Sequence, residues 1–190
     1  MTDPLVDLVA RTARMLEAEG FSYALIGALA RNAWARPRAT TDADFAVSVG
    51  ADQVDRLRAA LAALGLLVRK ELPDRAGGPV PELLLLVDGR DPTLRLDLLV
   101  AHTPFEASVL ARRVRTTVAG VELFVATAED LLVYQLVAGR PRDLADVEEV
   151  ARTRADLGAE VDWAYVERWA DAFGVAGRVA ALRTRLEAPG

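Results

Sequence analysis

Apolar and polar residues alternate along the first two thirds of the chain with two different periods. Apolar side chains recur every three or four residues over 4–19 and 52–64, which predicts amphipathic helices, and shorter helices are predicted over 28–35 and 104–112. Short apolar runs bounded by glycine or other turn signals predict strands. These strands are predicted over 21–26, 42–49, 66–71, 82–87, 94–100, 114–118 and 121–125. The mixture predicts an α+β fold, a mixed β-sheet flanked by helices.

Two turn signals predict pairs among these strands. Asp88-Gly89 lies between the runs 82–87 and 94–100, which predicts an antiparallel pair in the middle of the sheet. Ala119-Gly120 predicts a hairpin from the last two runs. We expect the sheet to end with this hairpin.

Helical periodicity replaces the strand pattern after residue 126. Thr127, followed three residues later by Asp130, is an N-cap signal for a helix that runs to Gly139. Further helices are predicted over 141–155, 162–172 and 175–187. The chain is therefore predicted to have an α/β core over residues 1–126 and a C-terminal helical region over residues 127–190.

The composition limits the chemistry available to the chain. There is no cysteine, which excludes disulfides and thiolate metal sites, and the one histidine, His102, cannot build a zinc site alone. Any metal must therefore be bound by oxygen. The formal charge of −5, from 23 basic and 28 acidic residues, argues against broad non-specific binding to nucleic acid.

The N-terminal residues lack the basic and then apolar order of a signal peptide. No apolar run approaches the roughly 20 residues needed to span a bilayer. We expect a soluble, cytoplasmic protein that does not contact a membrane.

Two aspartates lie in the predicted strand 42–49, and a third lies in the strand 94–100. Because side chains on a strand alternate between its faces, Asp42 and Asp44 point the same way, while Ala43 and Phe45 point into the core. Like charges held this close repel unless a cation lies between them, and hard oxygen ligands favour Mg²⁺. If the strand that carries Asp97 is a neighbour, three carboxylates converge, which is the arrangement that two-metal phosphoryl transfer requires.

Gly27 lies where a predicted strand enters a predicted helix. A glycine turn lets backbone N–H groups approach a phosphate, and the N-terminus of the helix adds positive potential. The alternative is that Gly27 only relieves crowding.

Together these motifs resemble the nucleotidyltransferase superfamily of the DNA polymerase beta type. The resemblance rests on Gly27-Ala28, the pair Asp42-x-Asp44 and the later Asp97. The segment 37–45 is similar to the Arg-x-Thr-x-Asp-x-Asp motif of small bacterial nucleotidyltransferases related to the abortive-infection (AbiEii-like) toxins. Residues 128–147 resemble their later Glu-Asp-Leu, Ala-Gly-Arg and Arg-Asp-x-x-Asp segment. The resemblance covers about residues 20 to 155.

The resemblance implies a nucleotidyltransferase fold and transfer of a nucleoside monophosphate from an NTP, with two Mg²⁺ ions, to an acceptor. It implies that Asp42, Asp44 and Asp97 are the catalytic and metal-binding residues. The implied nucleotide-binding residues are Gly27, Ala28, Arg31, Arg38, Thr40 and Arg140. In the late motif, Arg140, Arg142, Asp143 and Asp146 either close the cleft or fix the helical tail, for example as a salt-bridged helix junction.

Two positions depart from the family pattern. Ala28 stands where a second glycine or a serine is usual, and Gln135 stands where relatives commonly carry a lysine that can meet the triphosphate. Arg31 or Arg140 could supply that cation. The alternative hypothesis is a nucleotide-binding or protein-interaction module of the same fold without turnover. For an active enzyme the acceptor is tRNA, a protein or a small molecule, the acidic charge mildly disfavours tRNA, and a toxin would have an antitoxin partner.

Overall fold

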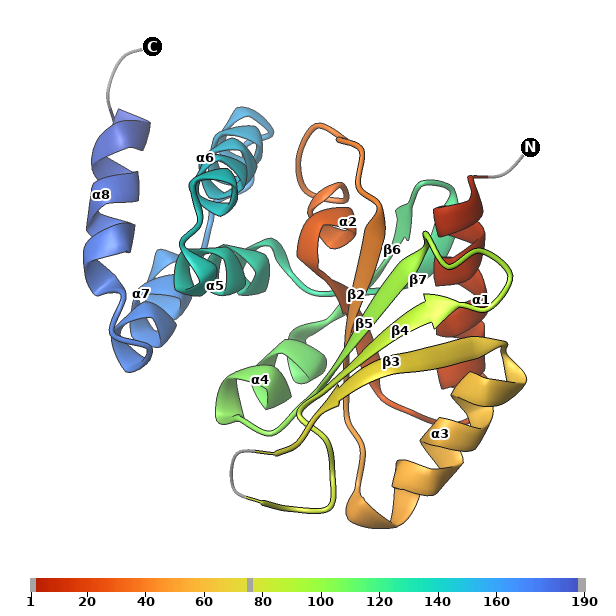
Figure 1. Cartoon of the computed structure of the whole chain (residues 1–190). Helices are drawn as coiled ribbons and strands as arrows, with labels where there is room; N and C mark the ends of the chain where they lie inside the picture. The colour runs from red at the N-terminus through yellow and green to blue at the C-terminus, as the bar shows by residue number, and fades with distance from the viewer. Residues whose placement is uncertain (1–2, 75–76, 188–190) are drawn as a thin grey trace.

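Within residues 3–74 and 77–187, which the computed structural model describes, seven strands form one mixed sheet (Figure 1). The strands are β1 (Tyr23–Ile26), β2 (Asp42–Val47), β3 (Leu66–Leu72), β4 (Leu83–Asp88), β5 (Arg95–Val100), β6 (Val114–Val118) and β7 (Val121–Val125). Their order across the sheet is β3-β4-β5-β2-β1-β7-β6. The predicted antiparallel pair β4–β5 and the hairpin β6–β7 are confirmed, and β6 is an edge strand.

The central strands β1 and β2 lie deep in the sheet. All four residues of β1 are buried, and on β2 the apolar Ala43 and Phe45, which are fully buried, alternate with the half-buried Asp42 and Asp44. β2 pairs with β1 in antiparallel and with β5 in parallel orientation. A strand with neighbours on both edges has little freedom to shift, so the side chains of β2 are held in fixed positions.

Helices cover both faces of the sheet (Figure 1). They are α1 (Pro4–Ala18), α2 (Gly27–Arg31), α3 (Val54–Ala63), preceded by the 3-10 turn η1 (Ala51–Gln53), and α4 (Pro104–Arg112). α1 and α3 lie on one face, and α4 lies on the other. The helix predicted over 28–35 ends already at Arg31, because the side chain of Asn32 bonds to the backbone of Arg38 and turns the chain into a loop.

Four helices follow β7 in the described part of the chain: α5 (Ala128–Ala138), α6 (Pro141–Asp156), α7 (Trp163–Ala172) and α8 (Ala176–Glu187). The predicted N-cap is confirmed: Thr127 Oγ1 accepts from the backbone N–H of Asp130 at 3.3 Å, and Asp130 Oδ2 accepts from that of Thr127 at 3.1 Å. Gly139 ends α5 in the left-handed conformation, with φ of 65°.

Buried apolar side chains from the sheet and from α5–α8 belong to one continuous cluster. The division into residues 1–126 and 127–190 stays a prediction, and residues 1–2, 75–76 and 188–190 of these two units lie outside the described residues. None of the helices that the structure describes is both long and apolar enough to span a bilayer.

Candidate active site

The register of β2 against β5 places two of the predicted aspartates directly beside each other. Asp44 is paired with Asp97, and Asp42 is paired with Arg95, in a parallel ladder. Asp42 lies two residues before Asp44 on the same face of β2, so the three carboxylates gather at one place. All three are half-buried. The sequence stated the convergence of the three carboxylates on the condition that the strand of Asp97 neighbours that of Asp42 and Asp44, and this condition is met.

These carboxylates lie in a cleft of about 490 Å³ between the sheet and the helical region. Its other described lining residues are Ile26, Gly27, Ala28, Arg38, Thr40, Tyr134, Gln135, Ala138, Arg140, Arg142, Asp143 and Asp146. Most of the predicted nucleotide-binding residues thus line the same cleft as the aspartates. A larger hollow of about 810 Å³ lies between α6, α7 and α8 and contains none of the residues singled out in the sequence.

Crowding of like charges changes the acidity of the cluster. Burial, followed by the charges of Asp42 and Asp97, raises the pKa of Asp44 to about 7, and Arg140 opposes the shift. Burial and the charge of Asp42 raise the pKa of Asp97, and Arg95 opposes this. A cation bound between these groups would relieve the repulsion that, together with burial, raises the pKa values of Asp44 and Asp97.

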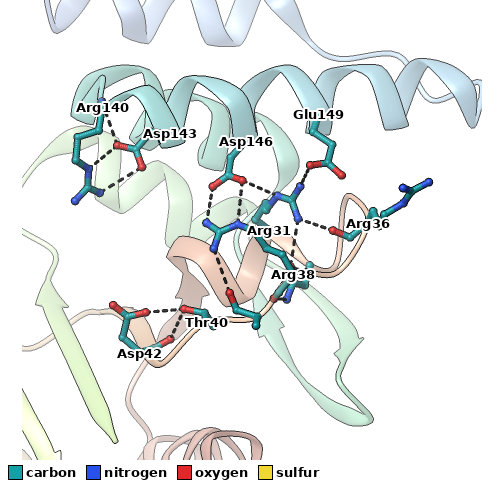
Figure 2. Close-up of polar contacts among 11 residues, drawn as sticks. Arg31, Arg36, Arg38, Thr40, Asp42, Arg140, Asp143, Asp146 and Glu149 are labelled. Atoms are coloured by element: carbon teal, nitrogen blue, oxygen red, sulfur yellow. Dashed lines mark hydrogen bonds and ion pairs between the residues drawn. The ribbon is translucent and has the colours of Figure 1, made fainter. Parts of the chain in front are cut away.

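Thr40 fixes the first carboxylate of the cluster. Its Oγ1 donates a hydrogen bond of 2.6 Å to Asp42 Oδ1 (Figure 2). Thr40 therefore keeps the side chain of Asp42 oriented in the cleft.

The donor set of the cluster fits Mg²⁺. Carboxylate oxygens are the ligands this ion prefers, and Mg²⁺ is commonly held by one or two carboxylates together with waters and substrate phosphates. Among residues 3–74 and 77–187, no group of three or more Asp, Glu, His or Cys side chains is arranged so that it could hold a metal ion. An ion at this cluster would therefore need further ligands, such as the phosphates of a substrate.

Gly27 is required at its position for two reasons. Its φ of 69° lies in the left-handed region, and a Cβ built on it would come within 2.0 Å of Asp44 Oδ2. The register of β1 against β2 causes this contact, because Ile26 is paired with Asp44. Gly27 therefore relieves crowding against Asp44, and its approach to a phosphate stays a prediction. Because α2 has only five residues, its aligned peptide dipoles add little positive potential at Gly27, less than the sequence suggested.

Arg31 does not line the cleft, which corrects its predicted role at the nucleotide. Its side chain is fully buried, its Nε lies 3.2 Å from Asp146 Oδ1, and it also pairs with Glu149 (Figure 2). A buried guanidinium needs such counter-charges, and both come from α6. Arg31 therefore joins α2 to α6.

Arg140 and Gln135 lie on the helical side of the cleft. The side chain of Arg140 is 77% exposed, and its Nε lies 2.6 Å from Asp143 Oδ2, so it caps the start of α6. The side-chain Oε1 of Gln135 is buried and has no hydrogen-bond partner. The hydroxyl of Tyr134, to which the sequence assigned no role, is also buried without a partner. The available signal was a pair of polar residues within the otherwise apolar segment 131–138 of α5.

Comparison with solved structures identifies the architecture, whereas no protein-family model and no curated protein matches the chain. The solution structure of the antibiotic-resistance factor ANT(2″)-Ia has 19% identity and a TM-score of 0.63, over 97% of this chain and 98% of that one. The chain has the nucleotidyltransferase fold. Its mixed sheet with flanking helices matches that architecture, as the sequence predicted.

Two further solved structures share this fold. The crystal structure of ANT(2″)-Ia in complex with adenylyl-2″-tobramycin has 17% identity and a TM-score of 0.55, over 95% of this chain and 97% of that one. The lincosamide antibiotic adenylyltransferase LnuA, bound to lincomycin, has 13% identity and a TM-score of 0.53, over 79% and 96%. The narrower resemblance to abortive-infection toxins stays a prediction.

Replacing Gly27 with alanine should displace Asp44. We expect Gly27→Ala to lower the free energy of unfolding by about 1–2 kcal/mol through its positive φ, and to weaken Mg²⁺ binding because the new Cβ occupies the position of the carboxylate. Gly20→Ala is a matched control, since Gly20 has φ of 72° and nothing within 4 Å of its Cβ position. Denaturant unfolding and calorimetric Mg²⁺ titration measure both effects. An equal Mg²⁺ affinity in the two variants would contradict the assignment.

The raised pKa of Asp44 makes the stability of the metal-free protein depend on pH. Between about pH 4, the pKa of an unfolded aspartate, and about pH 7, the folded state binds this proton more tightly than the unfolded state. The free energy of unfolding therefore falls as pH rises through this window, and the loss is complete above it. Asp44→Asn removes the charge, so we expect the variant to be more stable than the parent by about 2 kcal/mol at pH 8.

This advantage should shrink toward zero near pH 4. Urea unfolding of parent and variant in EDTA at both pH values measures it. A stability difference that stays the same at the two pH values would show that Asp44 titrates normally.

Proposed function

We propose that the protein is a Mg²⁺-dependent nucleotidyltransferase that transfers a nucleoside monophosphate from an NTP to a hydroxyl group of a small molecule. The observation that carries this proposal is the cluster of Asp42, Asp44 and Asp97 on two adjacent strands, open to a cleft in a nucleotidyltransferase fold. Positioning and charge neutralisation account for most of the catalysis in such a transfer.

Several of the groups that line the cleft have a role in this proposal. Asp42, Asp44 and Asp97 would hold Mg²⁺, which would supply positive charge to neutralise the triphosphate and to lower the pKa of the acceptor hydroxyl. The backbone N–H groups at Gly27 and Ala28 face the phosphates, and Thr40 keeps Asp42 in place.

The transfer itself needs one proton acceptor. The acceptor oxygen attacks the α-phosphorus, the bond from that phosphorus to the pyrophosphate oxygen breaks, and pyrophosphate leaves. Asp97, whose pKa is raised, takes the proton of the attacking hydroxyl. Arg38 and Arg140, which line the same cleft, offer cations to the triphosphate.

Two observations favour a small-molecule acceptor over tRNA or a protein. The chain matches nearly the whole length of ANT(2″)-Ia, a resistance factor solved with an adenylylated antibiotic, and it also aligns with LnuA, solved with lincomycin. The formal charge of −5 works against binding of a polyanion such as tRNA. A toxin role with an antitoxin partner rests on the sequence resemblance alone.

Labelled NTPs and a panel of hydroxyl-bearing antibiotics test the proposal. With Mg²⁺ we expect label on a small molecule and release of pyrophosphate. Asp42→Asn, Asp44→Asn and Asp97→Asn should each lower the rate at least about 100-fold, because each replaces a negatively charged carboxylate with a neutral amide, at a cost of several kcal/mol in the transition state. Asp55→Asn, on a fully exposed side chain of α3, is the control and should keep the parent rate. A fully active Asp44→Asn variant would contradict the proposal. Label in tRNA or protein would show that the acceptor is not a small molecule.

The second candidate is a nucleotide-binding module without turnover, and Gln135 favours it because it leaves this wall of the cleft without a lysine. Gln135→Lys distinguishes the two. In an active enzyme the new ammonium should lower the KM for the NTP about tenfold through charge-assisted contact with phosphate. Turnover that appears only in Gln135→Lys would instead support the inactive module. Steady-state kinetics of parent and variant provide the measurement.

A further inference from the structure

Asp146 of α6 binds the guanidinium of Arg38 through both of its carboxylate oxygens (Figure 2). Arg38 Nε donates to Oδ1 at 3.0 Å, and Arg38 Nη2 donates to Oδ2 at 2.5 Å. Asp146 is only 5% exposed. Such a two-point contact fixes the plane of a guanidinium as well as its position.

The backbone of Arg38 is fixed independently. Asn32 Oδ1 accepts from the backbone N–H of Arg38 at 3.1 Å, and Asn32 Nδ2 donates to its carbonyl oxygen at 2.9 Å. Arg38 lies in the segment 32–41, which has no helix or strand. Because both ends of the residue are held, the entropy cost of ordering this long side chain is met during folding rather than on ligand binding.

Arg38 can keep its contact with Asp146 and still bind an anion. A guanidinium carries five N–H donors, and Asp146 uses one on Nε and one on Nη2. One further contact, from Nη1 to the carbonyl oxygen of Ala39, is long at 3.4 Å. Since Arg38 lines the cleft together with Thr40 and Asp42, its remaining donors are available on the side where the phosphates would lie.

Arg31 and Glu149 complete the network of charges around the contact between Asp146 and Arg38. Arg31 is fully buried against Asp146 and pairs with Glu149, so two cations meet two anions. Among the described residues, Glu149 pairs with Arg31, and no hydrogen bond or ion pair joins it to Arg38. Arg31 also donates to the carbonyl oxygen of Arg36 at 2.5 Å, which ties the start of the same loop.

We propose that Asp146 is a positioning residue, which orients Arg38 toward the phosphates of the nucleotide. The helical region thereby contributes to nucleotide affinity through Arg38. The identity of the ligand rests on the proposed function.

Affinities for Mg²⁺-ATP and for adenosine, measured by competition against a fluorescent ATP analogue, test this inference. Asp146→Asn and Arg38→Gln should each weaken Mg²⁺-ATP binding about tenfold, because a charge-assisted contact to phosphate is lost. Adenosine, which has no phosphate, should bind both variants as it binds the parent. The double variant should bind Mg²⁺-ATP no more weakly than Arg38→Gln alone, since Asp146 acts through Arg38.

Glu149→Gln is the matched control. It removes a carboxylate from the same helix and the same network but leaves the contact between Asp146 and Arg38, so Mg²⁺-ATP affinity should stay at the parent level while stability falls. If Asp146→Asn does not fold, Arg38→Lys replaces it: a lysine keeps the charge but cannot bind Asp146 at two points and phosphate together, so Mg²⁺-ATP binding should weaken.

Three results would overturn the inference. Asp146→Asn could bind Mg²⁺-ATP as tightly as the parent or more tightly, Glu149→Gln could weaken binding as much as Asp146→Asn, or Arg38→Lys could bind like the parent. A parent protein that binds none of the NTPs would be a different failure, because it overturns the proposed function together with this inference.

Discussion

The parallel pairing of β2 with β5 holds three carboxylates at one place, and the site depends on this constraint. Asp44 is set against Asp97 by the register of the ladder, and Asp42 follows on the same face. Their mutual repulsion and partial burial are unfavourable in the free protein, as the raised pKa of Asp44 shows. A divalent cation with phosphate ligands would convert this unfavourable arrangement into a binding site.

The rest of the fold keeps this arrangement from relaxing. Ala43 and Phe45 anchor β2 in the core on the opposite face, so the aspartates cannot turn away without exposing buried apolar surface. Gly27 leaves the space that the Asp44 carboxylate fills. From the helical region, α6 fixes Arg38 through Asp146, which holds a cation in the cleft that contains the three carboxylates. Sheet and helical region therefore build the two walls of the cleft together.

Local patterns predicted most of the elements, including the helix 104–112, the hairpin 114–125 and the common face of Asp42 and Asp44, because these depend on nearby residues. From the sequence, we could state only as a condition that the strand of Asp97 lies beside the strand of Asp42 and Asp44. The order of strands in a sheet is set by contacts between residues distant in sequence. Arg31 was misassigned for the same reason: its partners lie on α6, 118 positions away in the case of Glu149. The close approach of Asp44 to Gly27 could be recognised only from the register of β1 against β2, in which Ile26 is paired with Asp44.

The central claim is that Asp42, Asp44 and Asp97 form a metal site shared with a triphosphate. Anomalous diffraction from crystals grown with Mn²⁺ and a non-hydrolysable ATP analogue tests it most directly. The account predicts a Mn²⁺ peak within coordination distance of at least two of these carboxylates and of the phosphates, on the cleft side of β2 and β5. A bound analogue with no Mn²⁺ peak between its phosphates and these carboxylates would contradict it.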